Sequence, residues 1–168
     1  MNDSAPPAWQ IALIDRATYC RGRIITSFAQ CEFLLADLAE KVDGRFIYLL
    51  RDRVKAAKAL TEKSGPFNQY AADLVPMAEK LLEWDDVRNF LVHGFVMLTT
   101  DKAMNHMFEY RRYNRVSKEE YELRQWFVSI EDLERAKDHI NALAIVMVDT
   151  MKRIYVDQNL EKEVQELF

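Results

Sequence analysis

The sequence predicts a mainly α-helical fold: a four-helix up-and-down bundle with a small antiparallel β-meander inserted between the third and fourth long helices. The first observation behind this prediction is that apolar residues recur at helical spacing over long stretches of the chain. The second is that 168 residues contain only four glycines and four prolines, which favours long helices over a turn-rich β fold. The third is the aromatic-rich, partly alternating segment 95–128. At this length, residues 1–168 form one domain by default.

Two helices are predicted in the first third of the chain. Residues 1–7 form a flexible arm with two prolines, and the first helix runs from Ala8 to about Val42. Gly44 is available as its C-terminal cap. The second helix runs from about Arg45 to Lys63 and is locally basic. A solvated helix face explains this basic character, and a phosphate-contacting surface is the alternative explanation.

Two further long helices are predicted on either side of the meander. The third runs from about Asn68 to Val92, and Pro76 either kinks it or marks its true start. The last begins at Ser129, whose side chain caps it, and continues to about Tyr155. Residues 157–168 carry four apolar residues on one face, which predicts a short amphipathic C-terminal helix that docks on this chain or on a second copy.

Residues 95–128 are predicted to be a β-meander of two or three strands. Phe95–Leu98 is a short apolar run, and two aromatic-rich runs follow it at His106–Tyr113 and Tyr121–Val128. The third run has a helical alternative, because Ser117 and Glu120 have the spacing of a capping box.

A group of polar residues stands at the end of the third predicted helix. Asp85, Arg88 and Asn89 project into the sector that was apolar earlier in that helix, where charged groups are costly unless they are paired or accessible. His93 lies four residues after Asn89 and shares its face. Gly94 is then expected to end the helix in the left-handed conformation.

Arg88-Asn89, three residues and then His93 resemble the Arg-polar-x-x-x-His signature of HEPN domains. These are small helical bundles, and many are metal-independent ribonucleases of toxin, antiviral and RNA-processing systems. The resemblance implies Arg88, Asn89 and His93 as catalytic residues, RNA as the substrate and no cofactor. It also implies a homodimer and, for a toxin, a cognate inhibitor protein as a partner.

These side chains suit RNA cleavage chemically. A histidine can act as acid or base near neutral pH, and an arginine can stabilise charge on the phosphate in the transition state. Asn89 would orient His93 or hold a phosphate oxygen. Arg88 and His93 are five residues apart, about 140° around an ideal helix, so a shared site requires a distorted last turn or a second protomer.

The alternative hypothesis is a non-catalytic helical module that uses the same polar residues for dimerisation or for binding a nucleotide or protein partner.

Aromatic and basic residues interleave in one short segment, which has two interpretations. Its members are Tyr110, Arg111, Arg112, Tyr113 and Arg115. They predict either a surface that stacks on single-stranded bases, with Arg111 and Arg112 binding substrate, or an amphipathic sheet that covers a core.

Other candidate residues favour structural roles. Glu32 is interpreted as a surface carboxylate beside a core stripe, with a site role as the alternative, and His106 and His139 are interpreted as structural or exposed. Two cysteines and three scattered histidines supply no metal-ligand cluster.

Composition bounds the location and the partners. The net charge of −4 argues against a protein that coats nucleic acid through bulk charge. The N-terminus lacks the pattern of a signal peptide, and no run of eighteen apolar residues exists, so a protein of the reducing cytoplasm without membrane contact is expected.

Overall fold

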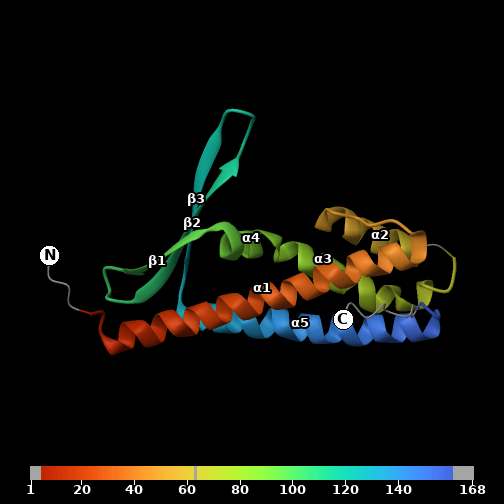
Figure 1. Ribbon diagram of the computed structural model, residues 1–168, viewed down its shortest axis with the longest axis horizontal. Coiled ribbons are helices and arrows are strands. Elements are labelled where there is room, and N and C mark those ends of the chain that lie inside the picture. The colour runs from red at the N-terminus through yellow and green to blue at the C-terminus, as the bar shows by residue number, and fades with distance from the viewer. Residues whose placement is uncertain (1–4, 63, 161–168) are drawn as a thin grey trace, which may run out of the picture. The chain divides into compact units, whose positions relative to one another are not determined.

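The computed structural model describes residues 5–62 and 64–160, and this part of the chain is mainly helical with a small antiparallel sheet (Figure 1). The helices are α1 (Ala8–Asp43), α2 (Leu50–Glu62), the 3-10 helix η1 (Asn68–Tyr70), α3 (Ala71–Glu83), α4 (Asp85–His93) and α5 (Ile130–Asp157). The strands are β1 (Phe95–Thr100), β2 (His106–Arg115) and β3 (Tyr121–Val128). The predicted meander between helices is therefore confirmed.

The chain divides into two compact units. The first, called the meander unit here, comprises Met1–Ser27 and Asp85–Asn141. The second, called the helical unit, comprises Phe28–Trp84 and Ala142–Phe168. The long helices α1 and α5 each contribute residues to both units.

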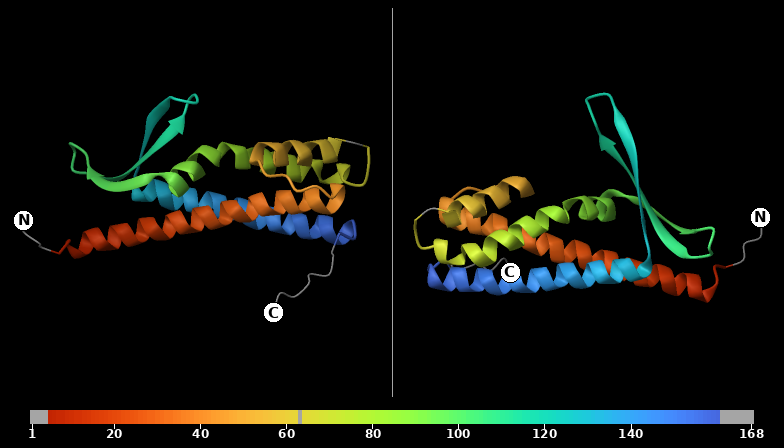
Figure 2. Two further views of the ribbon diagram at one scale, coloured as in Figure 1. Left: turned by 45° about the horizontal axis from the view of Figure 1, so that its top comes forward. Right: turned by 180° about the vertical axis from the view of Figure 1, so that it is seen from behind.

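The meander is a three-stranded sheet in the order β1-β2-β3, with both pairs antiparallel. Tyr121–Val128 is a strand, so the helical alternative suggested by the capping-box spacing is wrong. Its side chains alternate between the faces of the sheet, and Tyr110 on β2 lies opposite both Val96 on β1 and Trp126 on β3. In Figures 1 and 2 the far end of the β2–β3 hairpin extends away from α4.

One face of the sheet is apolar and buried, and we call it the inner face. Phe108, Tyr110 and Val128 are at most 4% exposed on this face. Trp126 lies beside them, with its ring centroid 5.4 Å from that of Tyr110. The opposite, outer face carries exposed apolar side chains, which include Phe95, Tyr113, Leu123 and Phe127. The alternation of the sequence is therefore that of an amphipathic sheet.

The start of α5 follows the predicted cap. The Oγ of Ser129 accepts a hydrogen bond from the backbone N–H of Asp132 and donates one to its carboxylate. These bonds satisfy one of the free N–H groups of the first turn and lower the pKa of Asp132.

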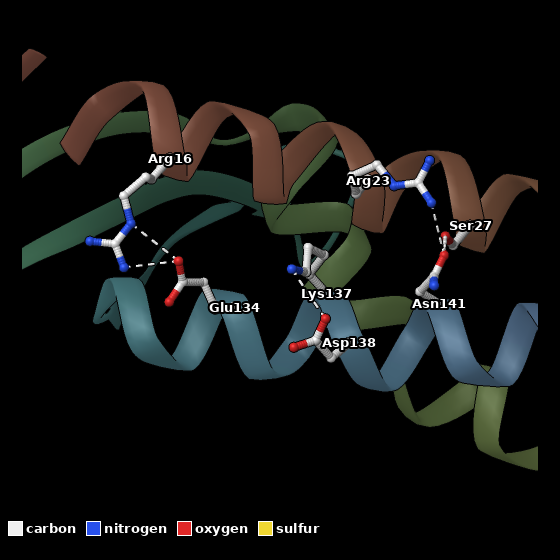
Figure 3. A network of polar contacts seen from close by, with 7 residues as sticks. All are labelled: Arg16, Arg23, Ser27, Glu134, Lys137, Asp138 and Asn141. Atoms are coloured by element: carbon white, nitrogen blue, oxygen red, sulfur yellow. Dashed lines mark hydrogen bonds and ion pairs between the residues drawn. The ribbon is translucent and has the colours of Figure 1, made fainter. Parts of the chain in front are cut away.

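Within the meander unit, α5 contacts α1 through an ion pair between Arg16 and Glu134 and through Arg23 and Ser27, which both donate to Asn141 (Figure 3).

In the helical unit, α1 ends as predicted but α2 starts later. Gly44 has a φ of +64° and caps α1. Residues 45–49 form a loop rather than a helical turn, which corrects the predicted start at Arg45. The reason is that Ile47 turns inward while Phe46 and Tyr48 stay exposed, and Arg53 donates to the Ile47 carbonyl oxygen at 2.7 Å.

The remaining contacts of the helical unit join its helices through paired polar groups. Lys58 on α2 bonds Glu79 on α3, and Arg153 on α5 bonds Asp73 on α3. The Tyr155 hydroxyl donates to Asp37 at 2.6 Å, and burial together with this bond raises the pKa of Tyr155.

The predicted third helix, Asn68 to Val92, is three shorter helices in the structure. Pro76 lies inside α3, so the alternative that it marks the start of the helix is wrong. The backbone leaves the α-helical pattern at Trp84, and α4 begins afresh at Asp85. The polar residues therefore stand on a nine-residue helix of their own, in the meander unit rather than in the helical unit.

Gly94 ends α4 for a different reason from the predicted one. It does not adopt positive φ, unlike Gly44. A Cβ atom at Gly94 would overlap the carbonyl oxygen of Phe90, which already accepts the N–H of Gly94 at 2.8 Å. The passage from α4 into β1 therefore requires a residue without a side chain.

This difference gives a stability test with two matched substitutions. Gly94→Ala should lower the free energy of unfolding by about 1–3 kcal/mol, because backbone must shift to admit the methyl group. Gly22→Ala on α1 should raise it by roughly 0.5–1 kcal/mol, because nothing lies within 4 Å of that position and alanine favours helix. Urea denaturation of both variants checks the two signs, and a harmless Gly94→Ala would contradict this account of the junction.

The ends of the chain are described only in part. Residues 5–7 precede α1 without helical structure, and residues 1–4 of the predicted arm lie outside the described part. Residues 161–168, most of the predicted C-terminal helix, also lie outside it. Among the described residues, no helix combines the length and the apolar character needed to cross a bilayer.

Candidate functional site

The candidate site is built on α4. Phe90 and Leu91 face inward and are at most 6% exposed. Arg88 and Asn89 are half-buried, and His93 is exposed at the last helical position. The helix therefore buries its apolar side chains and leaves its terminal histidine accessible to solvent.

Arg88 and Asn89 interact directly. An Nη1 hydrogen of Arg88 is donated to the Oδ1 of Asn89 at 2.9 Å. Asn89 therefore turns its acceptor oxygen towards Arg88, and its amide nitrogen, which bonds none of the described residues, can donate to a ligand. The structure brings these two predicted site residues together.

His93 is open to solvent rather than sealed in the core. Within the described part of the chain its ring makes no hydrogen bond or ion pair, so Asn89 does not orient it by a direct bond, which was the first of the two roles expected for Asn89. A histidine in this state can exchange protons with solvent or with a bound ligand. The half-buried Asn89 lies one helical turn before it, on the same face.

Arg112 attaches β2 to α4. Its Nη2 bonds the Oδ1 of Asp86 at 2.7 Å, its guanidinium carbon lies 4.6 Å from the ring centroid of Phe90, and its side chain is 12% exposed. The second oxygen of Asp86 accepts from Arg124 on β3 at 3.2 Å. Asp86 thus joins α4 to two neighbouring strands, because Arg112 and Arg124 are cross-strand partners.

Arg21 secures the other end of α4. Its Nε donates to the carbonyl oxygen of Leu91 across 70 residues of sequence. This bond satisfies one of the carbonyl groups that a helix leaves free in its last turn. With Arg112 and Arg124, which share the Asp86 carboxylate, it is the third arginine that fixes the position of α4.

Arg111 belongs to the opposite face of the sheet. It makes two hydrogen bonds with Glu109, at 2.6 and 2.9 Å, and Gln125 bonds the same carboxylate at 2.7 Å. The bonds from Arg111 lower the pKa of Glu109, although that residue is only 3% exposed. Because neighbouring residues of a strand face opposite ways, Arg111 and Arg112 do not share a surface.

The interleaved aromatic and basic residues are divided in the same way. Tyr110 is 1% exposed on the inner face, where it covers the core of the meander unit. Tyr113 is 70% exposed on the outer face, on the side of Arg111. The pattern therefore has a covering role on one face and leaves an aromatic side chain accessible on the other.

The other candidates occupy different places. His106 stacks on Trp9 with ring centroids 4.5 Å apart and contacts the Thr100 hydroxyl, whereas His139 is exposed on α5. Glu32 is half-buried in the helical unit, and its carboxylate lies 3.9 Å from a guanidinium nitrogen of Arg53. No group of three metal-binding side chains occurs in the ranges that the structure describes.

The two cysteines are free thiols in buried positions. Burial raises the pKa of the Cys31 thiol to about 12, so this residue is a poor nucleophile at neutral pH.

Sequence reasoning missed the residues that hold α4 in place. The sequence offered one indication for Asp86, because the helix dipole stabilises an acidic residue in the first turn. Arg21 and Arg124 carried none, because their partners are fixed only by the tertiary fold. Comparison of the chain with known protein families, with curated proteins and with solved structures gives no match.

Proposed function

We propose that the protein is a metal-independent endoribonuclease of the HEPN type in which Arg88, Asn89 and His93 form the catalytic group. The observation that carries this proposal is the exposed His93 at the end of α4, on the same nine-residue helix as the bonded pair Arg88 and Asn89. A nuclease needs this ring to be accessible, and a purely structural histidine does not.

The reaction is transfer of the phosphoryl group to the neighbouring ribose oxygen. A base removes the proton of the RNA 2′-hydroxyl, the 2′-oxygen attacks phosphorus, and the bond to the 5′-oxygen breaks as that oxygen receives a proton. The products are a 2′,3′-cyclic phosphate and a 5′-hydroxyl. His93 exchanges the proton, and Arg88 stabilises the negative charge on the phosphorus centre.

Asn89 is assigned a positioning role. Its Oδ1 accepts from Arg88, so it holds the guanidinium while its amide nitrogen donates to a phosphate oxygen. Of the two arginines expected to bind substrate, Arg111 is bonded to Glu109 on the outer face but keeps 40% of its side chain exposed, so it is assigned a contact with the RNA backbone away from α4. Arg112 is engaged by Asp86 and is assigned a structural role.

The active form proposed is a homodimer of four-helix up-and-down bundles, each with the chain as one domain. His93 lies five positions after Arg88, which places the two about 140° apart on a helix, and a second protomer can supply the complementary group. A cytoplasmic toxin or defence role, with a cognate inhibitor protein, follows from the same family resemblance.

A non-catalytic dimerisation or ligand-binding module is the second candidate. The observation in its favour is that several polar groups around α4 are already paired, with Asp86 held by Arg112 and Arg124. Such satisfied pairs are common at structural contacts.

Incubation of the purified protein with RNA in EDTA distinguishes the two candidates. We expect cleavage of RNA and none of DNA of the same sequence, because DNA lacks the attacking 2′-hydroxyl. A folded protein that binds these RNAs without cleaving them, as followed by fluorescence anisotropy and gel electrophoresis, would favour the binding module.

A further inference from the structure

The strand β3 forms a free edge of the sheet. The strand order β1-β2-β3 gives it one neighbour, and its pairing with β2 runs without a bulge from Phe108↔Val128 to Arg115↔Tyr121. It contains no proline and no lysine, and residues 121–125 are all exposed. Proteins usually protect an edge strand of this length with proline, lysine, a bulge or inward-pointing charges, because its free N–H and C=O groups can pair with another strand. Of these devices, β3 has the charges of Glu122 and Arg124.

Two opposite charges lie on the inner face of this edge. Glu122 and Arg124 are two residues apart, so their side chains project from the same face. Within the described residues the carboxylate of Glu122 makes no hydrogen bond or ion pair. The side chain of Arg124 is 43% exposed and, among the described residues, its one bonded partner is Asp86, so its remaining N–H groups can donate to a second carboxylate.

We propose that β3 pairs in antiparallel fashion with β3 of a second copy of this chain, across a two-fold axis at Leu123. In this register, residues whose numbers differ equally from 123 lie opposite each other. Glu122 of each copy therefore faces Arg124 of the other copy, and the two Leu123 side chains meet on the outer face at the axis. Cross-strand pairs of opposite charge and of apolar residues are the contacts that stabilise such a ladder.

The charges select this register among its neighbours. Moving the axis to residue 122 places Glu122 opposite its own copy, and moving it to residue 124 places Arg124 opposite its own copy. Like charges directly opposite each other destabilise a pair of strands. A shift of one residue in only one strand puts side chains from opposite faces next to each other, which disrupts the pattern of the sheet.

The pairing has a consequence for the proposed nuclease, and this consequence rests on the proposed function. The two sheets of three strands become one continuous sheet. In each copy α4 lies on the inner face, where Phe90 contacts Trp126 with ring centroids 6.0 Å apart and Asp86 bonds Arg124. A two-fold axis perpendicular to the sheet keeps both α4 helices on the same side, so the two catalytic groups face one common surface.

Charge exchange tests the pairing directly by sedimentation of the full chain. The wild type should dimerise, whereas Glu122→Arg and Arg124→Glu should each raise the dissociation constant roughly tenfold or more, because both cross-strand pairs become repulsive. The double variant E122R/R124E should dimerise again, and so should a 1:1 mixture of the two single variants. Glu119→Arg, in the β2–β3 turn, makes the same charge change outside the paired residues and should leave the dissociation constant unchanged.

The outcomes separate this inference from the proposed function. A monomeric wild type, single variants that dimerise normally, or a mixture that stays monomeric would overturn the pairing. Because R124E and the double variant both lose the bond to Asp86, recovery in the double variant shows that the charge pairing and not the lost bond sets the association. A dimer that follows these rules but does not cleave RNA would reject the nuclease and leave the β3 pairing in place.

Discussion

His93→Ala should reduce the rate of RNA cleavage in EDTA by about a hundredfold to ten-thousandfold, the usual contribution of a general acid–base residue. The ring is exposed at the end of α4 and has no hydrogen bond or ion pair within the described residues, so its removal leaves no internal partner unsatisfied. The variant should therefore fold and unfold like the wild type. Initial rates on a labelled oligoribonucleotide measure the loss.

His139→Ala is the matched control. His139 is also exposed, in the same unit of the chain, but it lies on α5 and not on α4. The His139→Ala substitution should leave the rate of RNA cleavage unchanged. Added imidazole should restore part of the activity of His93→Ala and have no effect on His139→Ala. Equal rates for the wild type and His93→Ala would remove this residue from the mechanism.

Arg88→Ala should reduce kcat by about a hundredfold to a thousandfold, as expected for the loss of one group that stabilises transition-state charge. Arg88→Lys should lie between this variant and the wild type. Lysine keeps the positive charge, but it lacks the planar fork that can bond Asn89 and a phosphate at the same time. The effect should appear in kcat more than in KM if the interaction forms mainly in the transition state.

Thermal unfolding distinguishes a catalytic loss from a folding defect, because Arg88 is half-buried. Arg16→Ala provides the comparison: it removes an arginine from the same unit that is paired with Glu134. It should leave kcat unchanged. Similar losses of kcat in the Arg16 and Arg88 variants would show that general stability, and not a specific role of Arg88, explains the effect.

Local patterns predicted much of the fold. The alternation in residues 106–113 and 121–128 predicted strands because one face of the sheet is buried, as Tyr110 and Val128 show. Ser129 predicted the start of α5 because its side chain forms the first capping bonds. Gly44 predicted the end of α1 because that position needs positive φ. Each of these features depends on neighbours in the sequence.

The errors arose where tertiary contacts overrode the local pattern. Phe46 and Leu49 have helical spacing, but Arg53 bonds the Ile47 carbonyl and holds this segment as a loop. One helix was predicted from Asn68 to Val92, yet the helix ends at Glu83 and a new helix, α4, begins after Trp84. Gly94 was expected to adopt positive φ. Instead, glycine is required there because a Cβ atom would overlap the carbonyl oxygen of Phe90.

The candidate site could be located from the sequence but not assembled from it. Arg88, Asn89 and His93 were identified by their spacing, and the alternation of strand residues would have separated Arg111 from Arg112. The network of Asp86 with Arg112 and Arg124 depends on the β2–β3 register and on the position of α4 against the inner face. Such contacts join residues far apart in the chain, and no local pattern encodes them.

The ends of the RNA fragments test the proposed chemistry most directly. Purified wild-type protein in EDTA, with mass spectrometry of the products, should give upstream fragments that carry a 2′,3′-cyclic phosphate and downstream fragments that begin with a 5′-hydroxyl. These ends require attack by the neighbouring 2′-oxygen, the step assigned to His93 and Arg88. Fragments that begin with a 5′-phosphate would contradict that mechanism, and intact RNA would contradict the nuclease function itself.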